Sequence, residues 1–313
     1  MQIGIIGTGM VGSATAFSLA TAGLADKLVL IDTNALRAKA EAMDISHATP
    51  FSFGTIITSG EYSDLINADI IIITAGSNQK PGETRLDLLS KNVAAFKQII
   101  PEIIKYSPNA ILLIATNPVD IMTEIALQLS DFPKNRIIGT GTVLDSARFR
   151  SILGHHLGIS PKSIHANVIG EHGDSEVLLW AGAVAGTSNV EIIAEQLHIN
   201  LDEKIKNKID DEVRNAAYSI IEGKGSTYYG IAAATQYIIK AISSDNHTIL
   251  NISSHHSTYQ DKPTDICFSM PSVISKKGVE TTLIPIMNQT EQEALLQSAR
   301  TLQEYTKKAL NML

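Results

Sequence analysis

His172 is the residue in this sequence best placed to transfer protons. It lies in the stretch Gly170–Ser175 (Gly-Glu-His-Gly-Asp-Ser), directly after an apolar run at 165–169 that is typical of a strand. A histidine beside glycine at a strand end packs poorly in a core, whereas its pKa near neutrality suits an exposed acid–base group. Metal binding is the competing role, but in the adjacent pairs His155-His156 and His255-His256 the side chains diverge. We therefore predict no metal site.

Asp145 and Arg148 offer a carboxylate and a guanidinium from one face of a predicted helix, because their spacing is i, i+3. The helix would begin after Thr140-Gly141-Thr142, and Arg150 would point about 200° away from Arg148 around it. From these residues alone a surface ion pair is the simpler interpretation. The functional alternative is that Asp145 fixes the tautomer of His172 and raises its basicity, if the fold joins them.

The polar stretch from Ser77 to Arg85 follows a buried strand predicted at 68–76. It contains Pro-Gly and no apolar residue, and it lies where a loop could close over an active site. Arg85 would begin the next helix, and the closing loop would bring it over a bound substrate. By composition alone, a solvated turn with an exposed arginine is the simpler interpretation.

A glycine-rich turn near the N-terminus indicates a dinucleotide site. Gly7, Gly9 and Gly12 follow an isoleucine-rich strand with G-x-G-x-x-G spacing and precede a helix predicted at 10–22. Gly7 permits the tight turn, Gly9 lets backbone approach a pyrophosphate, and Gly12 lets the helix pack closely. A second strand ends in Asp32, 20 residues after Gly12, where a carboxylate can accept both ribose hydroxyls. The negative charge of Asp32 would repel a 2′-phosphate, which favours NAD over NADP. The complete pattern of strand, glycines, helix and acid argues against a turn that binds no ligand.

These motifs require a sheet that brings strand ends together. Isoleucine-rich runs alternate with helical stretches through the first half of the chain. This pattern predicts an α/β fold with a doubly wound parallel sheet of the Rossmann type, followed by an α+β substrate domain. Segments after Gly7, Asp32, Gly76, Asn117 and Gly139 should face one crevice. Long helices are predicted at 202–221 and 289–311, and we divide the chain into domains at 1–141 and 142–313.

Composition limits the class of protein. With 313 residues, of which 44% are hydrophobic and 18% charged, the chain is typical of a globular protein large enough for two cores. A net charge of −7 argues against nucleic-acid and membrane partners. The single cysteine, Cys267, has no partner for an internal disulfide, which favours a cytoplasmic location.

In this order, the motifs resemble those of the L-lactate and L-malate dehydrogenase family. Matching stretches span nearly the whole chain, and they are Gly7–Gly12, Gln79–Leu88, Thr116–Asp120, Gly141–Arg150, Gly170–Ser175 and Gly225–Ile231. The resemblance implies NAD as cofactor, with binding residues Gly7, Gly9, Met10, Val11, Gly12, Asp32, Gly76, Asn117, Thr140 and Ile231.

The resemblance also implies catalytic roles. His172 is the proton donor in ketone reduction and the base in alcohol oxidation, and Asp145 orients it. Arg148 pairs in two-pronged fashion with the substrate carboxylate. Arg85 descends with the closing loop and polarises the substrate carbonyl, and Asn117 hydrogen-bonds near that carbonyl.

Gln79 decides between the two main substrates. At this loop position, lactate-specific members of the family have glutamine and malate dehydrogenases have arginine. A second substrate carboxylate would need a cation there, because burying it unpaired is costly. Glutamine beside Thr227, which lines the pocket for the substrate's side chain, suits a methyl group. We therefore expect pyruvate and L-lactate as substrates, with L-malate as the alternative and larger 2-hydroxy acids third.

Arg150 and His165 match positions at which bacterial members activated by fructose-1,6-bisphosphate bind phosphate at a subunit interface. The resemblance thus implies a homotetramer that a sugar bisphosphate activates. The stretch 253–262 has no counterpart in the motifs and is interpreted as an ordinary surface hairpin.

Two other functional classes compete with this interpretation. A dinucleotide-binding protein without catalysis would have no need to retain His172, Asp145, Arg85 and Arg148 together. A short-chain dehydrogenase would need a Tyr-x-x-x-Lys pair, and the stretch 218–222 begins with tyrosine but ends in glutamate.

Overall fold

The computed structural model of the chain describes residues 1–77, 85–259 and 262–313, apart from the side chains of residues 85, 262 and 263. Its main element is a nine-stranded sheet with the order β14-β13-β12-β6-β5-β4-β1-β2-β3. The parallel strands are β1 (Gln2–Ile6), β2 (Lys27–Ile31), β3 (Ile56–Ser59), β4 (Ile70–Ile73), β5 (Ile111–Ile114) and β6 (Ile137–Gly139). The order β3-β2-β1-β4-β5-β6 is that of a doubly wound dinucleotide-binding sheet, which confirms the predicted fold class.

Both faces of this sheet are buried, as isoleucine-rich parallel strands require. In β4, Ile71 and Ile73 belong to one core cluster, whereas Ile70 and Ile72 belong to another. The helices are α1 (Met10–Thr21), α2 (Ala35–Ser46), α3 (Arg85–Tyr106), α4 (Val119–Gln128), α5 (Val143–Leu157), α6 (Val190–Gln196), α7 (Glu203–Lys224), α8 (Tyr229–Ser244) and α9 (Gln289–Leu310). Short 3₁₀ segments lie at Thr49–Phe51, Tyr62–Leu65, Lys134–Arg136 and Pro161–Ser163.

The order of the sheet reverses at β1, which lies between β2 and β4. The chain leaves these strands at Gly7 and Thr74, and the Thr74 hydroxyl donates a hydrogen bond to the Gly7 carbonyl at 2.7 Å. Ligands of open α/β sheets bind beyond the carboxyl ends of the strands at such a point. The glycine turn therefore lies where a dinucleotide is expected.

Three antiparallel strands extend the sheet beyond β6, and they are β12 (Thr248–Tyr259), β13 (Lys262–Ser275) and β14 (Gly278–Thr282). The interpretation of 253–262 as an ordinary surface hairpin is wrong. Ser253 is fully buried and Ser254 is 4% exposed, because β12 pairs with β6 through Ser253 and Gly139. The base of the hairpin is thus part of the central sheet.

The remaining strands are short and belong to two small sheets, and they are β7 (Ile164–His165), β8 (Val168–Ile169), β9 (Val177–Leu178), β10 (Val184–Ala185) and β11 (Ser188–Asn189). The single strand predicted over 165–169 is wrong, because β7 pairs with β10 whereas β8 pairs with β9. Asn167 lies at the break, and its side-chain oxygen accepts a hydrogen bond from Asn251 at 2.8 Å.

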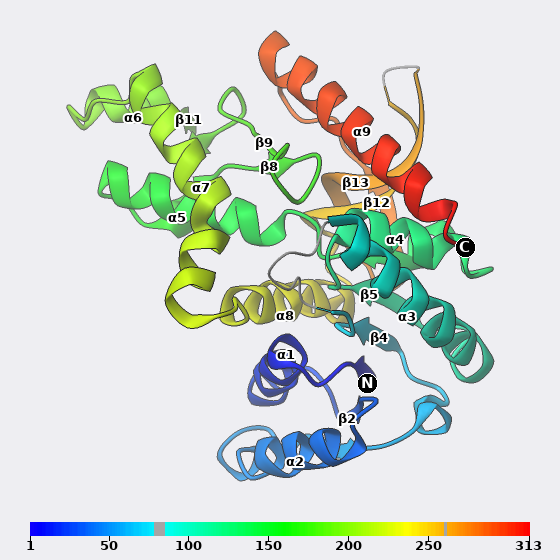
Figure 1. Cartoon of the computed structure of the whole chain (residues 1–313). Coiled ribbons are helices and arrows are strands. Elements are labelled where there is room, and N and C mark those ends of the chain that lie inside the picture. The colour runs from blue at the N-terminus through cyan, green and yellow to red at the C-terminus, as the bar shows by residue number, and fades with distance from the viewer. Residues whose placement is uncertain (78–84, 260–261) are drawn as a thin grey trace.

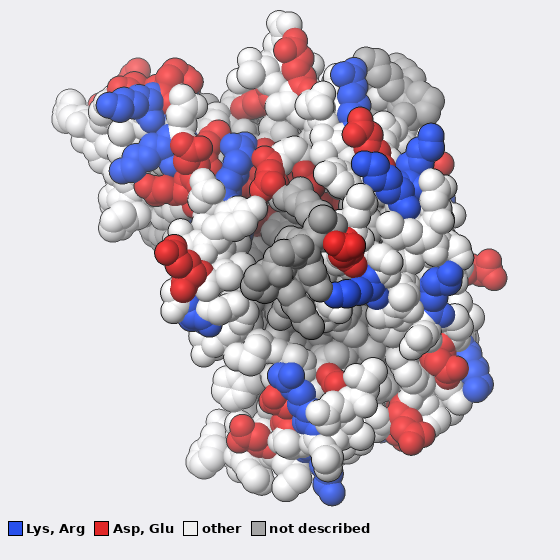
Figure 2. Space-filling view, viewed as in Figure 1, with Lys and Arg blue, Asp and Glu red and all other residues white. Residues whose placement is uncertain are grey.

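Helices α1 and α2 lie together at one end of the molecule, and α5, α6 and α7 lie toward the other end (Figure 1). On the face shown in Figure 2, acidic and basic side chains are interspersed, without one large patch of either sign. Among the described residues, no helix combines the length and apolar character needed to cross a membrane.

Candidate active site

The turn after β1 has the geometry expected of a pyrophosphate cradle. Gly7 has a φ of 96°, a value that favours glycine. A Cβ on Gly12 would lie 1.9 Å from the Gly7 carbonyl oxygen, so α1 packs this closely only because residue 12 is glycine. A Cβ on Gly9 would meet no described atom within 4 Å, which leaves open space for a ligand beside Met10 and Val11 in the first turn of α1.

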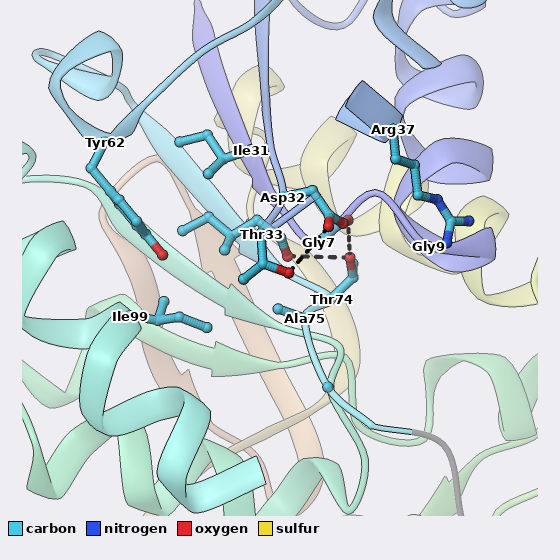
Figure 3. A pocket seen from close by; sticks show the side chains of 12 residues that line it. Gly7, Gly9, Ile31, Asp32, Thr33, Arg37, Tyr62, Thr74, Ala75 and Ile99 are labelled. Carbon is cyan, nitrogen blue, oxygen red and sulfur yellow. Dashed lines mark hydrogen bonds between the residues drawn. The ribbon is translucent and has the colours of Figure 1, made fainter. Parts of the chain in front are cut away.

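Asp32 lies beside this turn, directly after β2 (Figure 3). One carboxylate oxygen accepts the Thr8 N–H at 2.7 Å, and the other accepts the Asn34 N–H at 2.9 Å. Burial raises the pKa of Asp32, but these N–H groups outweigh burial and hold it below its ordinary value. The carboxylate is thus charged at neutral pH and retains lone pairs for ribose hydroxyls. The cavity here has a volume of about 330 Å³, and its lining includes Gly7, Gly9, Asp32, Thr33, Arg37, Tyr62 and Gly76.

Replacing Asp32 by serine should relax the choice between cofactors. Without the carboxylate, a 2′-phosphate meets no like charge at the end of β2, and Arg37 in the same cavity can pair with it. Because like-charge juxtaposition costs several kcal/mol, we expect kcat/KM with NADPH relative to NADH to rise at least about tenfold. Steady-state kinetics with both cofactors measure this ratio, and an unchanged ratio would contradict the role of Asp32.

His172, Asp145 and Arg148 form one contiguous group. The Asp145 carboxylate lies 2.6 Å from His172 Nδ1 through one oxygen and 2.7 Å from an Arg148 guanidinium nitrogen through the other. The side chain of Asp145 is 2% exposed and that of Arg148 is 14% exposed, so the surface ion pair considered from sequence is wrong. Helix α5 supplies both residues, and the loop between β8 and β9 supplies His172.

The charges within this group favour the protonated form of His172 and the ionised form of Asp145. Burial alone would lower the pKa of His172, but the Asp145 carboxylate outweighs burial and raises it to about 9. Burial likewise works against ionised Asp145, yet His172 and Arg148 hold its pKa below the ordinary value. The arrangement therefore keeps a protonated imidazole available at neutral pH.

Replacing Asp145 by asparagine should lower the pKa of His172. In the native protein His172 stays protonated until the pH approaches its pKa of about 9, so a rate that depends on the protonated ring, as the family resemblance implies for ketone reduction, should fall only above that pH. Without the carboxylate, the midpoint should move to lower pH, toward the ordinary histidine value of about 6.5. A pH series of NADH oxidation tests this, and an unmoved midpoint would contradict the pairing.

Two acids that the sequence analysis did not single out approach His172. Asp120, in α4, accepts the backbone N–H of His172 at 2.8 Å, and burial raises its pKa to about 6. Burial, together with the Asp145 charge, raises the pKa of Glu176 to about 8. Asp120 belongs to a helix whose other residues up to Leu127 are also buried, and a buried acid in such a run is the signal that could have identified it.

Asn92, in α3, connects the segments that follow β4 and β5. Its side-chain oxygen accepts the Ser77 N–H at 2.8 Å, and its amide nitrogen donates to the Asn117 carbonyl at 2.8 Å. Asn117 and His172 line one cavity of about 240 Å³. Asn117 thus lies in this adjoining cavity, whereas Gly7, Asp32 and Gly76 share the first one.

The remaining predicted residues are placed as follows. Thr140 is buried after β6, Ile231 packs against the core from α8, and Thr227 is half-buried between α7 and α8. Arg150 is half-buried and its Nε donates to the Ser146 carbonyl at 3.1 Å, whereas His165 is exposed on β7, which packs against α5. Gln79 and the side chain of Arg85 lie outside the described residues.

A dinucleotide crevice with a buried carboxylate paired to an imidazole in the same fold is the arrangement typical of an NAD-dependent dehydrogenase. Residues 1–139 match the family model of the lactate/malate dehydrogenase NAD-binding domain, and residues 142–313 match that of its alpha/beta C-terminal domain. The chain belongs to the lactate/malate dehydrogenase family, as its motifs indicated.

Relatives and solved structures agree with this membership. The chain is 48% identical to L-lactate dehydrogenase of Allorhizobium ampelinum over 97% of its own length and 98% of the relative's. It is 46% identical to that of Thermus aquaticus, over 96% and 97%. The crystal structure of the minor L-lactate dehydrogenase of Enterococcus mundtii superposes with a TM-score of 0.93 at 36% identity, covering 98% of each chain.

Proposed function

We propose that the chain is an NAD-dependent L-lactate dehydrogenase that reduces pyruvate reversibly. The contact of 2.6 Å between Asp145 and His172 is the observation that carries the proposal. The Asp145 carboxylate keeps His172 protonated, and the protonated ring can give the proton that ketone reduction requires. The bound nicotinamide supplies the hydride. The similar relatives are named L-lactate dehydrogenases. Their names support pyruvate rather than oxaloacetate as the substrate of this chain, so the malate alternative is not favoured.

His172 holds the proton in this proposal. Its Nδ1 faces Asp145, so Nε2 is the nitrogen that exchanges a proton with substrate oxygen. In reduction the imidazolium donates to the oxygen of pyruvate, and in oxidation the neutral ring accepts the hydroxyl proton of L-lactate. Asp145 stabilises the imidazolium and fixes the tautomer of the neutral ring.

The other side chains position and polarise the substrate. Arg148 would pair with the carboxylate of pyruvate through the nitrogens that Asp145 leaves unoccupied. Arg85 and Asn117 would polarise the carbonyl as negative charge develops on its oxygen. Thr140 and Ile231 are proposed to contact the nicotinamide.

Replacing Gln79 by arginine should move the substrate preference toward oxaloacetate. The new cation would pair with the second carboxylate of oxaloacetate, which otherwise remains buried and unpaired at a cost of several kcal/mol. We expect the ratio of kcat/KM for oxaloacetate to that for pyruvate to rise about a hundredfold or more. Lys80→Met is the matched control, since Lys80 is the neighbouring cation in the sequence. An unchanged ratio in Gln79→Arg would show that residue 79 does not set specificity.

The test of the function is NADH oxidation by the native protein with pyruvate and with oxaloacetate. The proposal expects pyruvate to be preferred by orders of magnitude. Preference for oxaloacetate would make the chain a malate dehydrogenase, and turnover of neither would reject the proposal.

We also propose a homotetramer that fructose-1,6-bisphosphate activates, with Arg150 and His165 as phosphate ligands. The family resemblance supports this, and β7, which carries His165, packs against α5, which carries Arg150. The same kinetic assay with the bisphosphate tests activation, and sedimentation tests the tetramer. No effect on pyruvate saturation or on quaternary structure would refute the regulatory site.

The domain division at residue 141 and the cytoplasmic location also remain predictions.

A further inference from the structure

Glu124, His255 and Cys267 form a buried cluster at α4, where Glu124 follows Asp120 by about one helical turn. Glu124 lies in α4, and the hairpin strands β12 and β13 supply His255 and Cys267, which face each other in register. The side chains of Glu124 and His255 are 1% and 3% exposed, and Cys267 is 2% exposed. None of the three takes part in the proposed reaction.

The donor atoms of the cluster converge. One carboxylate oxygen of Glu124 accepts hydrogen bonds from His255 Nδ1 at 2.9 Å and from Cys267 Sγ at 3.2 Å. All three donor atoms lie within 4.8 Å of one another, as the ligands of one ion must. The proton on His255 Nδ1 and the thiol proton of Cys267 therefore both lie between these three groups, each of which can bind a metal ion.

The types of donor select the ion. A thiolate and an imidazole are ligands of Zn²⁺ and its neighbours in the transition series, whereas Mg²⁺ and Ca²⁺ take oxygen ligands. One thiolate, one carboxylate and one divalent ion sum to zero charge, so the loaded cluster would bury no net charge. This removes the penalty that an unpaired buried ion carries.

The residues around the cluster support the imidazole and the carboxylate. Asp265 lies 3.2 Å from His255 Nε2, where a carboxylate can orient a metal-binding histidine. Lys134, an exposed residue, is 2.7 Å from the same nitrogen and can turn toward solvent when Nε2 becomes the protonated atom. Gln128 donates to the second oxygen of Glu124 at 2.9 Å and holds its orientation.

We propose that Glu124 Oε2, His255 Nδ1 and Cys267 Sγ bind one Zn²⁺ ion, with water as the fourth ligand. Binding releases the thiol proton to solvent, and the imidazole proton passes from Nδ1 to Nε2, where Asp265 accepts its hydrogen bond. One net proton leaves for each ion bound. This site does not depend on the proposed dehydrogenase function, and it differs from the sequence-based expectation of no metal site.

Cobalt(II) titration of chelator-treated native protein tests the site directly. Because Cys267 is the only cysteine in the sequence, any thiolate-to-cobalt charge-transfer absorption must come from this residue. We expect this band in the near ultraviolet to saturate at one equivalent of Co²⁺ and to disappear when Zn²⁺ is added in competition. Absence of the band in folded protein with excess Co²⁺ would overturn the proposal.

Variants separate this site from adventitious binding to surface histidines. Cys267→Ser should lose the band, and Asp265→Asn should weaken Co²⁺ binding about tenfold or more. His256→Gln is the matched control, because His256 is adjacent on β12 but packs on the Phe268 ring at 4.3 Å between centroids. Its Co²⁺ affinity should equal that of the native protein. Equal weakening by His256→Gln and Asp265→Asn would show that the hairpin fold, and not ligation, controls the signal.

Discussion

Replacing His172 by asparagine should lower kcat for pyruvate reduction by about two to four orders of magnitude, the contribution typical of a positioned acid–base group. Asparagine can hydrogen-bond to Asp145, but it has no titratable proton to give to the ketone oxygen. The cofactor crevice lies around Asp32 and does not include His172, so NADH affinity should change little. Stopped-flow reduction and fluorescence titration of NADH measure the two quantities separately.

His156→Asn is the matched control for that experiment. The ring of His156 contacts the Asn200 carbonyl at 2.8 Å, away from the cavity that holds His172. Its kcat should equal that of the native protein. A His172→Asn variant with nearly full activity would mean that another group, such as Glu176, supplies the proton.

Replacing Arg148 by leucine should lower kcat/KM for pyruvate by about 30-fold to several thousandfold. This range corresponds to the 2–5 kcal/mol that is lost when one partner of a buried charge pair is removed. The variant also removes the guanidinium that lies 2.7 Å from Asp145, so the pH midpoint should be recorded for each variant.

Arg148→Lys distinguishes charge from geometry. Lysine retains the positive charge but not the planar fork that binds a carboxylate with two hydrogen bonds. We expect its kcat/KM to lie between those of the leucine variant and the native protein. Equal values for Arg148→Lys and the native enzyme would exclude a two-pronged contact, and equal values for Arg148→Leu would exclude any contact with substrate.

Much of the fold followed from local patterns. Isoleucine-rich runs predicted the parallel strands because a strand buried on both faces needs apolar side chains on both, as β4 shows. The helix limits at α1 and α9 were predicted to within one or two residues. The short strands were harder: β7 and β8 have two residues each, and their separate pairings depend on β10 and β9, which lie farther along the chain.

The site was predictable only in part. The i, i+3 spacing of Asp145 and Arg148 placed them on one helix face, but nothing local indicated that the face is buried beside His172. Asp120 was missed because its partner is the backbone N–H of a residue 52 positions away. Asn92 was missed for the same reason, since its partners Ser77 and Asn117 follow two different strands.

The glycine cradle and the acid at the end of β2 were predictable because each depends on residue spacing within one short segment, and the doubly wound sheet was predictable from the alternation of apolar runs with helical stretches. Which distant ionisable groups become buried beside one another depends instead on how the sheet and helices pack. This packing placed Asp145 against His172, and it joined Glu124 to His255 across 131 positions of sequence. The physical reason is that the pKa of a buried group depends on its nearest charges and on its loss of hydration. Packing of the sheet and helices sets both.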